Sequence, residues 1–70
     1  MLKFTDEDQA FIKDNFKNSD QLLNATRRQD VLDPLFDLIE EKGFAPPHYD
    51  EYNDFGREAQ KIYDSIYYNN

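Results

Sequence analysis

Few side chains in this sequence could do chemistry, and none has a recognisable catalytic partner. His48 is the only histidine, and it is the only side chain that ordinarily exchanges protons near neutral pH. There is no cysteine, and the two serines, Ser19 and Ser65, are expected in a helix-cap region and on a polar helix face. Carboxylates are plentiful, but a catalytic pair needs a concave pocket that separates their pKa values. A chain of 70 residues is not expected to supply one, so we predict that the protein is not an enzyme.

Metal and cofactor binding are not expected either. A calcium loop of the EF-hand kind needs oxygen ligands at fixed positions and a glycine at its sharp turn. A loop that starts at Asp50 puts Phe55 at the glycine position, and one that starts at Glu51 puts Ile62 at the position of the final glutamate. His48 has no second histidine or cysteine with which to bind a transition metal. The sequence also has no glycine-rich phosphate loop, and we predict no metal and no cofactor.

Residues 46–49, Pro-Pro-His-Tyr, match the PPxY pattern and resemble a ligand of WW domains. Such a ligand must be exposed and extended, because it binds as a polyproline II segment in an aromatic groove. Here the four residues lie between two strongly predicted helices. We therefore interpret the segment as a rigid helix connection in which the prolines end one helix and Tyr49 packs on the core.

The predicted third helix carries a run of carboxylates on one side. Like charges four residues apart disfavour a helix by roughly 0.2–0.5 kcal/mol each, and no base follows the first two acids at that spacing. The carboxylates are either a solvated face or an interaction face that imitates nucleic-acid phosphates and occupies a basic nucleic-acid-binding protein. This candidate acidic face consists of Asp33, Asp37, Glu40 and Glu41.

A second candidate interaction face lies at the aromatic C-terminal end. Tyr67 is expected to extend the buried side of the last helix, whereas Tyr68 points roughly the other way. Tyrosines favour interfaces because one end of the ring is apolar and the other can stay hydrated. The pair would suit a homodimer or a partner's groove. Alternatively, both rings pack on the first helix and close the bundle.

The charge distribution bears on the kind of partner. The net charge is −7; residues 1–30 have six acids and five bases, whereas residues 31–70 have nine acids and three bases. An acidic half argues against direct binding of nucleic acid or an anionic membrane, and it permits a basic protein partner. No apolar run approaches the ~20 residues of a membrane span. With no cysteine and no secretory signal pattern, we expect a cytoplasmic protein.

Helical patterns dominate the chain. The first helix is predicted to begin after Thr5, which caps it, and a short second helix is predicted over about residues 20–28. The third begins at an Asp30 or Asp33 cap and ends at Lys42, with Gly43 as a left-handed C-cap. Its broad apolar arc is predicted to face inward, and consists of Val31, Leu32, Leu35, Phe36, Leu38 and Ile39.

The last helix has the strongest periodicity and is predicted to start between Asp50 and Asn53. Gly56 lies beside its apolar stripe, where a glycine costs about 1 kcal/mol against alanine but lets a neighbour approach the backbone. The stripe consists of Tyr52, Phe55, Ala59, Ile62 and Ile66.

The expected fold is all-α: residues 1–70 form a single helical domain, a small compact bundle of three main helices plus one short helix. We expect a small, non-catalytic protein-binding or regulatory module whose partner is another protein. The alternatives are an acidic nucleic-acid mimic, and a structural or assembly subunit, or homo-oligomer, that uses the aromatic end.

Overall fold

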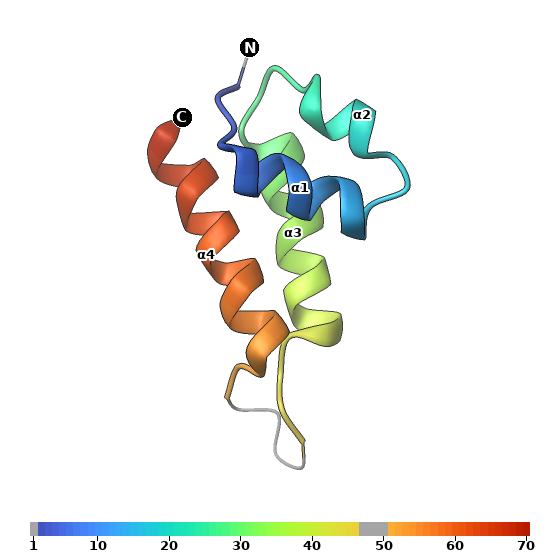
Figure 1. Ribbon diagram of the computed structural model, residues 1–70, viewed down its shortest axis with the longest axis vertical. Coiled ribbons are helices and arrows are strands. Elements are labelled where there is room, and N and C mark those ends of the chain that lie inside the picture. Colours follow the sequence, from blue (N-terminus) through green and yellow to red (C-terminus); the bar gives the residue numbers. More distant parts are fainter. Residues whose placement is uncertain (1, 47–50) are drawn as a thin grey trace.

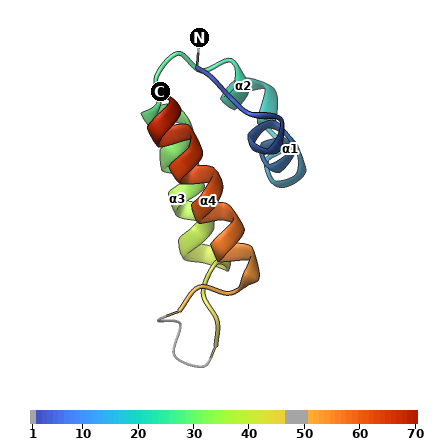
Figure 2. The same ribbon diagram turned by 60° about the vertical axis from the view of Figure 1, so that its left-hand side comes forward.

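The computed structural model describes residues 2–46 and 51–70, and it confirms the all-α prediction. Four helices make up 69% of the structure: α1 (Asp6–Asn15), α2 (Ser19–Leu23), α3 (Gln29–Lys42) and α4 (Asp54–Asn69). The long helices α3 and α4 lie side by side along the long axis (Figure 1). α1 and α2 lie together on one side of this pair (Figure 2), near the end where Lys3 donates its backbone N–H to Asn70 Oδ1 at 2.7 Å.

The core is where the four helices meet. It is built from side chains at helical spacing, as expected of amphipathic helices whose apolar stripes face one another. Partly buried residues, among them Phe4, Phe16 and Phe55, pack around it. The buried apolar residues are Phe11, Ile12, Leu22, Val31, Leu32, Leu35, Leu38, Ile39, Ala59, Ile62 and Ile66.

α1 begins where the sequence predicts. Thr5 Oγ accepts the backbone N–H of Asp8 at 3.0 Å, and Asp8 Oδ2 accepts the backbone N–H of Thr5 at 3.0 Å. This reciprocal capping box satisfies two amides that the first helical turn would otherwise leave without partners.

The start of α3 and the extent of α2 differ from the predictions. α2 ends at Leu23, so the prediction that it extends to about residue 28 is wrong. The backbone between α2 and α3 is irregular. α3 starts at Gln29, with Arg28 rather than Asp30 or Asp33 at the N-cap, and without a side-chain cap. Pro34 consequently lies inside the helix, beyond the first turn, where its missing N–H removes one helical hydrogen bond.

α3 and α4 are joined through a glycine contact. Gly43, the C-cap of α3, has φ −91°, so the predicted left-handed conformation is wrong. Its backbone is instead held close to Gly56: a Cβ placed on Gly56 would lie 2.0 Å from the Gly43 carbonyl oxygen. Gly56 therefore permits the close backbone approach that the sequence predicts, with the end of α3 as the neighbour.

The ends of the connection between α3 and α4 are fixed by specific contacts. Asn53 caps α4 by accepting the Gly56 N–H at 2.7 Å, and its Nδ2 donates to the Lys42 carbonyl at 2.7 Å. Phe44 pairs with Tyr52 in an isolated antiparallel bridge, with their rings stacked 5.2 Å apart. These contacts agree with a helix connector, while Pro47, His48 and Tyr49 of the PPxY motif lie outside the described residues.

Candidate functional sites on the surface

All four members of the acidic face are exposed on α3. Gln29 donates a side-chain hydrogen bond to Asp33. Only two ion pairs occur among the described residues, Asp54–Arg57 and Glu7–Lys61, and neither involves α3. The acidic face is therefore not neutralised by any base that the structure describes. The structure thus brings these carboxylates together in water, and their role in binding stays a prediction.

Phe36 lies beside the acidic face, and the prediction that it faces inward is wrong. Its side chain is 52% exposed, whereas the neighbouring Leu35 is fully buried. At roughly 100° per residue, Phe36 lies about 40° beyond Leu32 around the helix axis, and the small bundle does not cover an arc that wide. On the helix surface its neighbours include Asp33 and Glu40, three residues before and four after. An apolar ring thus stands between carboxylates.

The aromatic end is also exposed. Tyr67 is 43% and Tyr68 80% exposed, and their rings meet edge to face with centroids 5.1 Å apart. The Arg28 guanidinium lies 4.4 Å from the Tyr67 ring centroid, and Nη1 donates to the Tyr67 carbonyl at 3.2 Å. This cation–π contact ties the end of α4 to the start of α3. The prediction that Tyr67 extends the buried side of the last helix is therefore wrong, because its ring is exposed and contacts Arg28 at the start of α3. The use of Tyr67 and Tyr68 in an interface stays a prediction.

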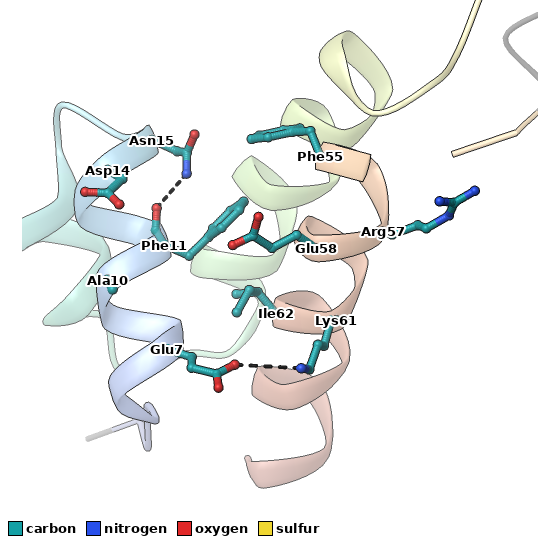
Figure 3. A pocket seen from close by; sticks show the side chains of 10 residues that line it. All are labelled: Glu7, Ala10, Phe11, Asp14, Asn15, Phe55, Arg57, Glu58, Lys61 and Ile62. Atoms are coloured by element: carbon teal, nitrogen blue, oxygen red, sulfur yellow. Dashed lines mark hydrogen bonds and ion pairs between the residues drawn. The ribbon is translucent and has the colours of Figure 1, made fainter. Parts of the chain in front are cut away.

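A groove of about 630 Å³ lies between α1 and α4 (Figure 3). The rings of Phe11 and Phe55 lie along it, with centroids 5.7 Å apart. The Glu7–Lys61 pair crosses one end, with Oε2 and Nζ 3.9 Å apart. No feature of the sequence pointed to this groove, because it depends on how far α1 diverges from α4.

Among the described residues, Asp8 is the one charged residue that is fully buried. The sequence does not predict that it joins two helices. Its Oδ2 accepts the Ser65 hydroxyl at 3.0 Å as well as the Thr5 amide, so it joins α1 to α4. Its Oδ1 has no hydrogen-bond partner. The prediction that Ser65 lies on a polar face is corrected: it is half-buried against Asp8 and accepts from Asn69 Nδ2 at 3.3 Å.

Residues 2–46 and 51–70 contain no group of three or more His, Cys, Asp or Glu side chains arranged to hold a metal ion. Within the same residues no helix has both the length and the apolar character that crossing a membrane requires. No known family, curated protein or solved structure matches this chain. Any proposal about function must therefore come from the surfaces described above.

Proposed function

We propose that the protein is a non-catalytic binding module that contacts a basic partner protein through the outer face of α3. The proposal depends on one observation above all, the half-exposed ring of Phe36 beside the acidic face. The other large apolar side chains of α3 are buried, so this ring is the position where the helix departs from an ordinary amphipathic pattern.

Phe36 and the carboxylates would have different roles in such a contact. An aromatic ring that becomes fully desolvated in a partner's pocket is a typical centre of binding energy. The carboxylates around it would pair with lysine or arginine side chains of the partner, guiding encounter and setting orientation. The surplus of nine acids over three bases in residues 31–70 favours a partner of positive charge.

Nucleic-acid mimicry is the narrower alternative, and it would depend on the acidic face alone. In that case binding would be almost entirely electrostatic and would fall steeply with salt. Phe36 favours the broader proposal, because a desolvated ring continues to contribute at salt concentrations that screen exposed charges. The salt dependence of binding therefore separates the two alternatives.

Assembly through the aromatic end is a second candidate function, favoured by the exposure of Tyr68. A ring that is 80% exposed at a helix end contributes little to this fold. In a homo-oligomer or larger complex it would be covered. This function predicts self-association or capture that is insensitive to changes on α3.

The test is affinity capture from the native lysate after nuclease treatment, with elution in steps of rising salt. The wild type is compared with Phe36→Ser, with the double variant Asp37→Asn/Glu40→Gln, and with Tyr68→Ala. We expect a basic protein that is lost with Phe36→Ser, is released at lower salt from the double variant, and is unchanged with Tyr68→Ala. A partner whose capture and salt elution are the same with Phe36→Ser and with the double variant as with the wild type would contradict the proposal.

The proposal retains two predictions from the sequence, a cytoplasmic location and the absence of catalysis. Fractionation of cells that express the tagged chain tests the first. For the second, the captured partner should keep an unchanged intact mass after incubation with the purified chain.

A further inference from the structure

The α1–α4 groove combines an aromatic floor with an acidic wall. Phe11 is buried and Phe55 half-buried, and together with Ile62 they form an apolar surface at the bottom of the groove. In Figure 3 the Glu58 carboxylate projects from α4 across this floor toward the Phe11 ring. A carboxylate held above aromatic rings is a suitable environment for a cation, because the ring faces are negative as well.

The bases of α4 near the groove already have partners. Arg57 and Lys61 both line the groove; Arg57 pairs with Asp54 at 3.2 Å, and Lys61 pairs with Glu7 at the groove's end. Glu58 is in neither of the two ion pairs found over residues 2–46 and 51–70. The groove is therefore lined by two carboxylates, Asp14 and Glu58, that belong to neither ion pair and are available for a positive charge that the described chain does not supply.

A second hollow, of about 400 Å³, continues the groove beyond the Glu7–Lys61 pair. The two hollows share Glu7, Lys61 and Ile62 as lining residues. Asp8 lines the second one, and its Oδ1 is buried without a hydrogen-bond partner. An unpaired buried oxygen is costly, and a hydrogen-bond donor placed in this second hollow, which adjoins the groove but does not share Asp8 with it, would offset that cost.

We propose that this groove binds an arginine side chain of the partner protein. The planar guanidinium would stack on the half-buried Phe55 ring, beside the buried Phe11, while its forked N–H groups bond the Glu58 carboxylate, a combination that a lysine ammonium cannot make. The inference rests on the proposed function for the class of partner, a basic protein. It assigns that partner a second contact, on a face formed by α1 and α4 and separate from the outer face of α3.

The test is a titration of the ¹⁵N-labelled full chain with N-acetyl-arginine amide, followed through backbone amide NMR shifts. The control ligand is N-acetyl-citrulline amide, which has nearly the same shape but no charge. Saturable shifts at Phe11, Phe55 and Glu58 with the arginine compound alone are expected. Shifts that do not saturate, or that the citrulline compound reproduces, would overturn the proposal.

Two matched variants test whether the Glu58 carboxylate is the one that binds the arginine compound. Glu58→Gln is expected to weaken binding of the arginine compound by about 1.4-fold to fivefold, the range of an exposed ion pair, while Glu41→Gln on α3 leaves its affinity unchanged. Equal weakening by both variants would show diffuse charge attraction and no groove site. This titration uses no partner, so its outcome is independent of the capture experiment that tests the function of α3.

Discussion

The inner and outer sides of α3 differ in whether their apolar residues are buried, and two adjacent residues show the difference. Leu35 is fully buried among apolar side chains, whereas Phe36 exposes about half of its ring beside carboxylates. The inner side is explained by folding alone, because burial of its apolar residues stabilises the bundle. The outer side is not, because an exposed phenylalanine and unneutralised acids contribute little or unfavourably to stability. Residues that folding does not require are the better candidates for binding.

The largest effect is expected on the inner side. Leu35→Ala should lower the free energy of unfolding by about 3 kcal/mol, because it removes a fully buried side chain and leaves a cavity. Phe36→Ala, one residue along, should lower it by about 1 kcal/mol or less. Urea denaturation followed by circular dichroism at 222 nm measures both. Equal losses would remove the distinction between the two sides.

The glycine contact gives the next largest effect. Gly56→Ala improves helix propensity by about 1 kcal/mol. Its new Cβ, however, would lie 2.0 Å from the Gly43 carbonyl oxygen, so the helices must separate. We expect a net loss of about 2 kcal/mol from overpacking. Tyr68→Ala, on the same helix but exposed, is the control, and it should stay within about 0.5 kcal/mol of the wild type. A Gly56→Ala variant that is more stable than the wild type would show that the Gly43 backbone can move away from the new Cβ at little cost.

Asp8 sharpens the comparison, because it is an acid whose role is structural. Asp8→Ala removes the bonds from Thr5 and Ser65, and we expect a loss of about 1.5 kcal/mol in the free energy of unfolding. Ser65→Ala removes only one of them and should cost about half as much. Thermal unfolding of the two variants compares the losses. An unchanged midpoint for Asp8→Ala would mean that its free oxygen offsets the benefit of the bonds.

The smallest effect is expected in the acidic face, and its sign is opposite. Asp37→Asn/Glu40→Gln reduces repulsion along α3 and should raise stability by a few tenths of a kcal/mol at low salt. The gain should disappear at 1 M salt, where the screening length is about 3 Å. Unfolding midpoints at two salt concentrations measure it. A loss of stability would instead show that these acids support the fold.

Much of the fold follows from local patterns in the sequence. The structure confirms the Thr5 cap, the close approach at Gly56 and the burial of Ala59, Ile62 and Ile66 on α4. Tyr52, which the sequence predicts on the same apolar stripe, lies before α4 begins and is 37% exposed. The sequence predicts the start of α3 too late, because Asp30 and Asp33 are good N-cap residues and yet lie within the helix. Pro34 added to the error, since proline is common in first turns.

The surface features were harder to predict, because they depend on tertiary distances. The exposure of Phe36 depends on how much of α3 its neighbours cover, which helical periodicity cannot reveal. The burial of Asp8 depends on Ser65, which is 57 residues away in the sequence. The groove depends on the divergence of α1 from α4. The acidic face needed only helical spacing, so its residues could be named from the sequence while its use could not.

Site-specific photocross-linking tests most directly whether Phe36 contacts a basic partner protein. The photoreactive analogue p-benzoyl-phenylalanine is introduced at Phe36, and in a matched chain at Tyr68, and each is irradiated in the native lysate. Both positions are aromatic and exposed, so the replacements disturb the fold little. We expect an adduct with a basic protein from position 36 and none with that protein from position 68. An adduct from position 68 alone would contradict this expectation and favour assembly through the aromatic end.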